Sequence, residues 1–371
     1  MLQELSSNQF ERARHLFQGF DYSLAVRAAI DGNNVGRIFV DDIEQPRTAF
    51  ALTVEGYLLA GKHENGTINR ALRRFLQEKI FSGEVFVVVD WAMSLAVHPE
   101  VWEALLSELI PTHEVEKIKR YHYLCRALGF DWRSHIPEGY SVRRIDRALL
   151  DAAADDRVRE WMDIEAVWGT VDNYLEHGIS FAVLYEGEMV AWCTPDCWAG
   201  GQMDVGIMTH QAHRRQGLAS IAAAATVEEC FKQGFSAVGW HCNAENIGSW
   251  KTAEKVGFER QRAYAYYYYM VDPIDHLAEL GWYNYRQEAY GKTVHYYEQV
   301  FALREDNPDY YYHLAASAWA LLQNGEKALF YLEAAADHGW TNWEYTSRQE
   351  EFGILHDTAE WDALLARIEN D

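Results

Sequence analysis

Cysteine, basic side chains and long apolar runs are all scarce in this chain of 371 residues. Its five cysteines are odd in number and scattered, which argues against a disulfide framework and favours the reducing cytoplasm. No run of about 18 apolar residues occurs, so we expect no helix that spans a membrane. The first six residues lack a basic end followed by an apolar core, so no secretory signal is expected.

Acidic residues outnumber basic ones by 56 to 33, which gives a formal net charge of −23. This excess disfavours nonspecific binding to nucleic acid or to an anionic membrane. It suits a cationic substrate such as an amine, although acidity that simply keeps the protein soluble is the simpler explanation. Residues 272–371 hold 19 acidic and six basic side chains, more than half of the excess. That asymmetry indicates a separate C-terminal unit.

The length suggests two or three domains, and the pattern of apolar residues favours three. Residues 1–139 form the first, an α/β domain that resembles an incomplete version of the one that follows. It has no glycine-rich turn with arginines, so we interpret it as a non-catalytic partner. Its expected helices are Asn8–Ala29, Thr67–Phe81, Pro99–Ile110 and Glu114–Leu128, and its expected strands are Val35–Val40, Thr48–Leu59 and Glu84–Asp90.

Residues 140–271 form the second domain, in which strands alternate with helices after a hairpin. That order predicts a mixed sheet with helices on both faces. The expected strands are Tyr140–Ile145, Ile179–Tyr185, Met189–Thr194, Gln202–Thr209, Ala237–Cys242 and Tyr264–Val271, and the expected helices are Arg147–Trp161, Asp163–His177, Arg215–Gly234 and Ser249–Val256.

Residues 272–371 are predicted to be helical throughout, with helices over Tyr290–Leu303, Pro308–Gln323 and Glu326–His338. A weak internal repeat supports helical hairpins, because a Lys, Tyr and Glu pattern recurs at a spacing of 35 residues. Such a period resembles tetratricopeptide repeats. A plain helical bundle is the alternative. The repeated residues are Lys292, Tyr296 and Glu298, followed by Lys327, Tyr331 and Glu333.

The clearest chemical signal is the segment Arg214-Arg215-Gln216-Gly217-Leu218-Ala219, which joins a strand to a long helix. The first turn of a helix has N–H groups without intrahelical partners, and the helix dipole adds positive charge there. Gly217 has no side chain, so a phosphate can approach the backbone closely. Arg214 and Arg215 can add charge-assisted hydrogen bonds. The segment therefore predicts a diphosphate site.

This turn resembles the acetyl-CoA motif of the GNAT superfamily of N-acetyltransferases, Arg/Gln-x-x-Gly-x-Gly/Ala between a strand and a helix. A second element is similar to the family's later motif. There the strand Trp240–Cys242 ends in a loop with Asn246, a short helix follows, and Gly257-Phe258 closes it. The resemblance covers about residues 140–271. Within the superfamily, the layout also resembles the branch of zwittermicin A resistance acetyltransferases.

The resemblance implies acetyl-CoA as cosubstrate and indicates where this chain would bind it. The strand edge at Ile207–Thr209 would pair with the pantetheine arm as an added strand does. Asn246 would face the cofactor, although Asn246 or Ser249 could instead cap the helix that follows. The candidate cofactor-binding residues are Ile207, Met208, Thr209, Arg214, Arg215, Gln216, Gly217, Leu218, Ala219, Asn246 and Ser249.

Direct transfer of an acetyl group requires a neutral amine, so a base or a water chain must take a proton. Asp204 and His241, on successive strands, are the candidate bases. Many members of the family protonate the departing thiolate with a tyrosine where this chain has Ala253. Tyr266, in a tyrosine-rich strand, is the candidate acid. Each of the three could instead be structural, and water could serve in their place.

We expect no metal, because Cys193 and Cys197 have no second pair at the spacing of a zinc site. The leading hypothesis is an N-acetyltransferase that acts on the amine of a small molecule, for instance an amino-bearing antibiotic. A second is a protein N-acetyltransferase whose substrate is recruited by the C-terminal helices. A third is an interaction protein that binds CoA without turnover, which Ala253 supports.

Overall fold

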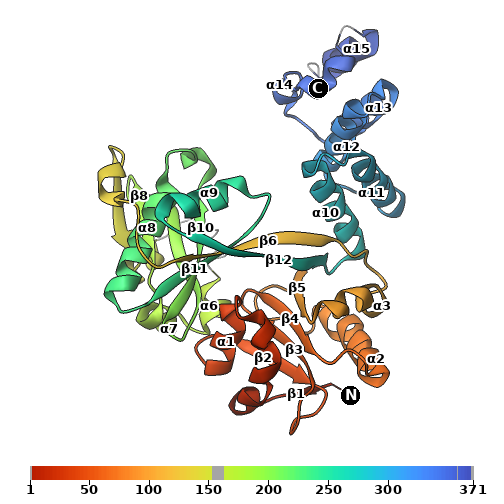
Figure 1. Cartoon of the computed structure of the whole chain (residues 1–371). Coiled ribbons are helices and arrows are strands. Elements are labelled where there is room, and N and C mark those ends of the chain that lie inside the picture. The colour runs from red at the N-terminus through yellow and green to blue at the C-terminus, as the bar shows by residue number, and fades with distance from the viewer. Residues whose placement is uncertain (1, 153–162, 357, 369–371) are drawn as a thin grey trace. The chain divides into compact units, whose positions relative to one another are not determined.

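A mixed β-sheet is the centre of the N-terminal part of the chain (Figure 1). The computed structural model describes residues 2–152, 163–356 and 358–368, and the chain divides into two compact units, Met1–Tyr269 and Met270–Asp371. The sheet has the strand order β1-β2-β3-β4-β5-β12-β6-β11-β10-β9-β8-β7. The strands are β1 Gln3–Glu4, β2 Gly36–Val40, β3 Thr48–Thr53, β4 Gly56–Gly61, β5 Ala92–His98, β6 Lys117–Cys125, β7 Tyr140–Arg144, β8 Phe181–Tyr185, β9 Glu188–Ala199, β10 Gln202–Thr209, β11 Ala237–Asn243 and β12 Glu259–Met270.

Helices cover both faces of strands β2 to β5. Successive side chains of a strand point to opposite faces, so Ile38 packs with one set of helices and Phe39 with the other. Ile38 lies in a core cluster with Phe10 and Phe17, and Phe39 lies in a second cluster with Leu72. The helices of this half are η1 Ser7–Phe20, α1 Leu24–Asp31, α2 Gly66–Phe75, η2 Leu76–Ile80, η3 Glu100–Leu105 and α3 Leu106–Leu109.

Four predictions for this half were wrong. Asn8–Ala29 is not one helix but two, η1 and α1, with a break at residues 21–23. Thr48–Leu59 is not one strand but the hairpin of β3 and β4, which turns between Thr53 and Gly56. Glu84–Asp90 is irregular and is not part of the sheet, with Val85 packed into the core and Phe86 43% exposed. Glu114–Leu128 contains strand β6 in place of a helix. Strand β6 pairs antiparallel with β11 on one side and β12 on the other, and this long-range pairing overrides the helical spacing of its residues.

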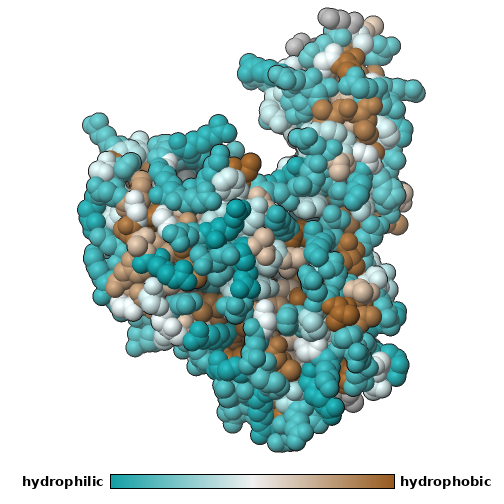
Figure 2. Space-filling model, in the orientation of Figure 1, coloured by the Kyte–Doolittle hydropathy of each residue, from teal (hydrophilic) through white to brown (hydrophobic). Residues whose placement is uncertain are grey.

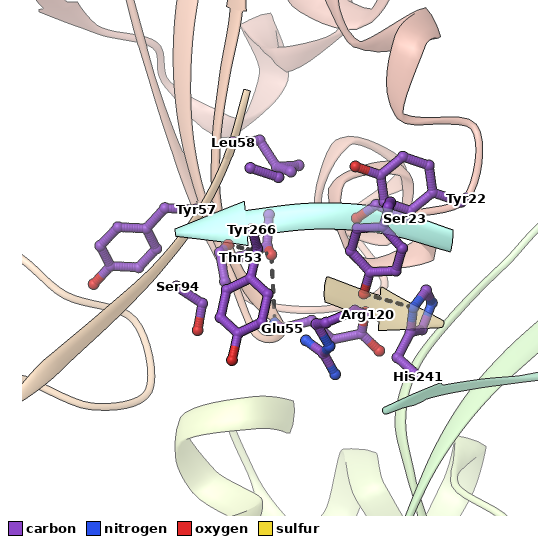
Figure 3. A pocket seen from close by; sticks show the side chains of 13 residues that line it. Tyr22, Ser23, Thr53, Glu55, Tyr57, Leu58, Ser94, Arg120, His241 and Tyr266 are labelled. Carbon is purple, nitrogen blue, oxygen red and sulfur yellow. Dashed lines mark hydrogen bonds between the residues drawn. The ribbon is translucent and has the colours of Figure 1, made fainter. Parts of the chain in front are cut away.

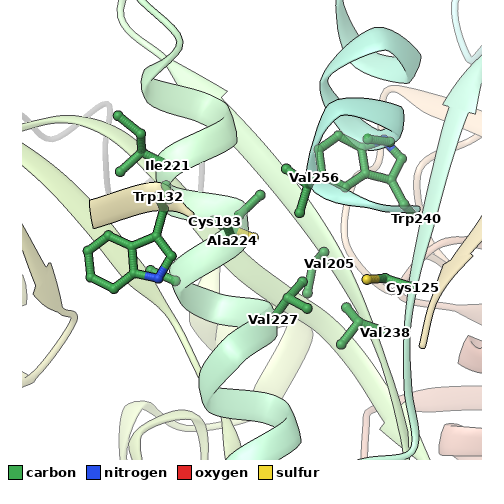
Figure 4. Close-up of a cluster of buried hydrophobic side chains, with 14 of the residues drawn as sticks. Cys125, Trp132, Cys193, Val205, Ile221, Ala224, Val227, Val238, Trp240 and Val256 are labelled. Atoms are coloured by element: carbon green, nitrogen blue, oxygen red, sulfur yellow. The ribbon is translucent and has the colours of Figure 1, made fainter. Parts of the chain in front are cut away.

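The second half follows the predicted order closely. Helix α8 packs its run Ala222–Ala225 against the sheet, where the small side chains allow close approach (Figure 4). The predicted helix Arg147–Trp161 is described only as far as Ala152, and its remainder lies outside the described residues. The helices are η4 Trp132–His135, α4 Arg147–Ala152, α6 Ile164–Trp168, α7 Val171–His177, η5 Gln211–His213, α8 Leu218–Lys232 and α9 Ile247–Val256.

Residues on the two sides of the expected boundary at Gly139 share one sheet. Strand β6 precedes that boundary, yet it lies between β11 and β12, which follow it. The contacts within the chain accordingly place residues 1–269 in one compact unit. The N-terminal half is therefore structurally continuous with the half that carries the diphosphate turn.

The C-terminal unit is helical. Helix α10 begins at Pro273 with Asp272 as its N-cap, since the Asp272 side chain accepts hydrogen bonds from the N–H groups of Ile274 and Asp275. Helix α10 packs against α11, and α12 packs against α13. Within the described residues, no helix is long and apolar enough to cross a bilayer. The helices are α10 Pro273–Arg286, α11 Tyr290–Leu303, α12 Asp309–Leu321, α13 Gly325–Asp337, α14 Trp343–Thr346, η6 Glu350–Ile354 and α15 Ala359–Ile368.

Candidate active site

Strands β10 and β11 separate partway along their length. They pair in parallel only from Gln202–Asp204 to Ala237–Gly239. Beyond Asp204, β10 continues to pair with β9, while β11 continues to pair with β6. The edge of β10 that faces β11 over Val205–Thr209 therefore has no strand partner in the described sheet. An extended ligand can hydrogen bond to such an edge.

A cavity of about 540 Å³ lies beside this open edge and brings most of the predicted cofactor residues together. It is bounded by the end of β10, the start of α8 and the start of α9. His213, Ser220, Gly248 and Thr252 also line it, although the sequence argument did not name them. The predicted residues in its lining are Ile207, Met208, Thr209, Arg214, Arg215, Gly217, Leu218, Ala219, Asn246 and Ser249.

The turn into α8 has the backbone geometry of an anion site. Arg215 and Gly217 adopt positive φ angles of 64° and 79°, and left-handed residues within a turn are typical of the backbone N–H concavities that bind anions. The Ile221 N–H is bonded to the Gly217 carbonyl at 3.2 Å, so the N–H groups of residues 218–220 precede the helical ladder. The Arg214 Nε donates to the Thr209 carbonyl oxygen at 3.2 Å and fixes the turn to the end of β10. A diphosphate fits this turn.

Three predicted cofactor residues also have structural roles. Gln216 is not in the cavity lining; its Oε1 accepts a hydrogen bond from the Tyr140 hydroxyl at 3.0 Å. The Asn246 Oδ1 accepts from the Ser249 N–H at 3.1 Å, so Asn246 is the N-cap of α9 as well as a lining residue. The Ser249 hydroxyl accepts from the Trp240 Nε1 at 3.0 Å. The helix-capping alternative for Asn246 is thus realised beside the cavity.

Asp204 and His241 lie together in the interior, on the face of the sheet that packs against α1. The His241 Nε2 and the Asp204 Oδ2 are 3.6 Å apart, and neither atom has a hydrogen-bond partner. The His241 Nδ1 is 2.9 Å from the Tyr264 hydroxyl (Figure 3, where His241 is labelled). Gly239 is required here, because a Cβ would collide with the Asp204 carboxylate. Burial raises the pKa of Asp204 to about 7 and lowers the pKa of His241 to about 4.

The other charged members of this cluster were not predicted from the sequence. Glu55, in the turn between β3 and β4, is half-buried, and its burial together with the nearby Asp204 raises its pKa to about 7. Burial, reinforced by the charge of Glu55, raises the pKa of Asp196 well above its usual range. Arg120 of β6 is a half-buried cation that acts on both Glu55 and Asp196. The only available signal was an acidic or basic residue inside an apolar strand or turn, as at Asp196 and Arg120.

Tyr266, the candidate acid, lies on β12 and is 8% exposed. Its hydroxyl is 3.4 Å from the Asn243 Oδ1, and the Arg120 guanidinium lies over its ring at 5.3 Å. Tyr266 lines a small second cavity with Glu55 and His241, and not the cavity at the turn into α8. Ala253 is fully buried in the core, so it offers no proton donor. The structure therefore brings Tyr266 near the candidate bases and away from the diphosphate turn.

Three potential metal ligands also meet in this cluster. Donor atoms of Glu55, Cys197 and Asp204 lie within 4.8 Å of one another. Burial, with the three neighbouring carboxylates, raises the pKa of the Cys197 thiol well above its usual range, which disfavours the thiolate that metals prefer. The expectation that the protein needs no metal stays a prediction.

Comparisons with known proteins agree with this geometry. The family model described as GNAT acetyltransferase matches residues 14–267. The chain is 23% identical over 269 residues to an uncharacterized N-acetyltransferase, YdfB, of Bacillus subtilis strain 168, covering 72% of this chain and 98% of the relative. Its fold is similar to a GCN5-related N-acetyltransferase-like protein from Streptococcus suis, with a TM-score of 0.55, 24% identity, and coverage of 71% and 99%. A GCN5-related N-acetyltransferase from Sphaerobacter thermophilus matches with a TM-score of 0.50, 10% identity, and coverage of 74% and 96%.

The family model begins at residue 14 and ends at residue 267, close to the end of the first compact unit at Tyr269. It therefore covers the N-terminal half as well as the half that carries the diphosphate turn, which is more of the chain than the sequence motifs alone indicated. Members of the family use acetyl-CoA as cosubstrate, and the turn, cavity and open strand edge fit that molecule. The chain belongs to the GNAT acetyltransferase family and is an N-acetyltransferase with an additional helical C-terminal unit.

Proposed function

We propose that this enzyme transfers the acetyl group of acetyl-CoA directly to an amino group of a small molecule. The observation that carries the proposal is the separation of β10 from β11, with a cavity for the cosubstrate along β10 and a buried acidic cluster where the strands part. An acidic interior favours an acceptor that arrives as a cation. Among small amines, the resemblance to antibiotic-resistance acetyltransferases makes an amino-bearing antibiotic the first class to test.

Different parts of the chain bind the cosubstrate and take the proton of the acceptor. The N–H groups at the start of α8 hold the diphosphate, and the backbone of Ile207–Thr209 orients the pantetheine arm. Acetyl-CoA supplies an activated acetyl thioester when it is bound. The acceptor must lose a proton, and buried carboxyl groups such as Asp204, with a pKa of about 7, are suited to take one near neutral pH.

We expect acetyl-CoA to raise the unfolding midpoint of the protein by several degrees, because a ligand that binds only the folded state stabilises it. At least one primary amine from a panel of spermidine, tyramine and kanamycin should then release free CoA thiol above the rate without amine. Thermal shift and thiol release measure the two effects. Absence of cofactor-induced stabilisation would contradict the proposal.

The alternative is a protein substrate recruited by the helical unit. Helices α11 and α13 carry the sequence repeat, and they contact each other through it, since the Lys327 Nζ is 2.8 Å from the Glu298 Oε1. This relation supports tetratricopeptide-like pairs. Figure 2 shows hydrophobic residues exposed over this unit on an otherwise largely hydrophilic face. The most exposed large apolar side chains there are Leu303 and Phe330.

A shortened chain that ends at Val271 distinguishes the small-amine substrate from the protein substrate. The family model stops at residue 267 and the first unit has its own apolar cores, so we expect this shorter chain to fold. It should retain small-amine acetylation within about threefold of the full chain, measured as kcat/KM. Acetylation of cell proteins by the full chain only, with no small-amine activity in either, would favour the protein substrate.

A further inference from the structure

The small second cavity lies between the two halves of the sheet unit and is lined from both (Figure 3). Glu55 comes from the turn between β3 and β4, in the half that the sequence argument treated as non-catalytic. Arg120, His241 and Tyr266 come from β6, β11 and β12. Figure 3 shows the side chains of Glu55, Arg120 and His241 close to one another in this cavity. The cavity is small, so it suits the end of a molecule and not a whole large substrate.

The charges around the cavity are unbalanced. Glu55, Asp196 and Asp204 are three acidic groups in mutual electrostatic contact, whereas Arg120 is the one cation that acts on both Glu55 and Asp196. Burial lowers the pKa of His241, so this imidazole is neutral near pH 7 and does not make up the difference. Buried charges are costly unless they are paired. Asp204 is buried and Glu55 and Asp196 are half-buried, so this surplus of acidic groups favours bound protons or a cation.

The same cluster lies where β10 and β11 part. Asp204 is the last residue of β10 that pairs with β11, and His241 lies two residues beyond Gly239, the last residue of β11 that pairs with β10. Ile207, in the lining of the cofactor cavity, is three residues further along β10, which is about 10 Å at the rise of a β-strand. The point where the strands part thus has a lining residue of the second cavity, His241, on β11 and a lining residue of the cofactor cavity, Ile207, on β10.

One hydrogen bond and one close approach connect the second cavity with Asp204. Burial raises the pKa of Tyr264 far above neutral pH, so its hydroxyl keeps its proton and can donate to the His241 Nδ1. The His241 Nε2 then carries the hydrogen that faces the Asp204 Oδ2 at 3.6 Å. Both facing atoms are buried without a hydrogen-bond partner. These contacts position His241 beside Glu55 as a neutral group.

We propose that this cavity binds the amino group of the acceptor as a primary ammonium ion and that Glu55 is the carboxylate that receives its proton. The inference rests on the proposed function and adds the acceptor site to it. An N–H bond of the ammonium breaks, an O–H bond forms on Glu55, and the electron pair stays on nitrogen. The N-terminal half thereby supplies a catalytic residue to the family's cofactor-binding half.

The titration of Glu55 depends on groups from every element packed around it. The charges that raise or lower its pKa come from β9, β10, β11 and β6, and tyrosines of β12 and of the segment before α1 line the same cavity. These groups are Asp196, Cys197, Asp204, His241, Arg120, Tyr264, Tyr266 and Tyr22. A base needs its deprotonated form, so kcat/KM for the acceptor should rise with pH through a midpoint near 7 to a plateau.

Glu55→Gln tests the assignment, with the exposed Glu64→Gln as matched control. For whichever panel amine the natural protein acetylates, we expect kcat/KM to fall about 100-fold in Glu55→Gln and its rise with pH toward 7 to disappear. Stabilisation by acetyl-CoA should be unchanged in both variants. Retention of kcat/KM and of the pH profile in Glu55→Gln would overturn the role of Glu55 while the acetyltransferase activity stands.

Direct binding decides the question if no panel amine is acetylated. Propylammonium chloride is titrated calorimetrically into the CoA-saturated full chain at pH 8, with tetramethylammonium, which has no N–H group, as comparison. We expect propylammonium alone to bind, and at least tenfold more weakly in Glu55→Gln. No propylammonium binding, equal binding in the variant, or a stoichiometric metal ion in the purified protein that Glu55→Gln removes would each overturn the proposal.

Discussion

Replacing Gly217 with aspartate is expected to abolish the stabilisation by acetyl-CoA and to reduce acetyl transfer at least 100-fold. Gly217 lines the cofactor cavity at the N-cap of α8, where the positive end of the helix faces the diphosphate site. A carboxylate at this position would lie where phosphate oxygens bind and would repel them. Thermal shift with acetyl-CoA and thiol release measure the two losses.

Gly234→Asp is the matched control, because Gly234 follows the other end of the same helix. Its φ of 91° resembles the 79° of Gly217, so both substitutions impose a similar backbone strain. No atom would lie within 4 Å of a Cβ at Gly234. Equal loss of cofactor binding in both variants would show that the effect comes from helix strain and not from the diphosphate site.

Asp204→Asn is expected to change how the stability of the protein depends on pH. The pKa of Asp204 is about 7 in the folded chain and near 4 when unfolded, so its neutral form contributes stability that is present below pH 4 and lost as pH rises through 7. Asparagine does not titrate and removes this loss. Relative to the natural chain, the variant should therefore gain roughly 2–4 kcal/mol between pH 5 and pH 8.

Urea unfolding at the two pH values, followed by tryptophan fluorescence, measures this difference. His241 changes the stability with pH in the opposite direction. Its pKa is lowered to about 4, so the neutral imidazole contributes stability that is present above pH 6.5 and is lost as pH falls through 4. Its contribution is present in both proteins and largely cancels in the comparison. Exposed Asp90→Asn should follow the natural chain, and parallel curves for Asp204→Asn would mean that Asp204 stays ionised when buried.

The cofactor side of the site was predictable because it is local in the sequence. Strand β10 was predicted with its observed ends, and the turn at Arg214–Ala219 and the loop at Asn246 follow successive strands. The geometry of such motifs follows from the local sequence, since a strand, a turn and the start of a helix suffice to form an anion site. Only Gln216 departs from the expected lining, because the Tyr140 hydroxyl from β7 binds its side chain.

The acidic cluster was not predictable as a unit, because it forms only when distant strands align. Asp204 and His241 were identified singly, but Glu55 and Arg120 belong to regions interpreted as a non-catalytic domain and as a helix. Strand β6 could not be separated from a helix by its spacing, since its ladder partners lie more than a hundred residues later. The misassigned strand and the missed site residues therefore have one cause, which is long-range pairing.

Strand β12 has a consequence for how the chain is made. It is the last strand of the sheet to be synthesised, yet it lies between β5 and β6 and is the link between the two groups of strands. Until residues 259–270 leave the ribosome, β5 and β6 are both open edges, which are prone to pair with other chains. The proposed acceptor site and the cofactor cavity would be joined only in that final step, so we expect no acetyl transfer from a chain that lacks β12.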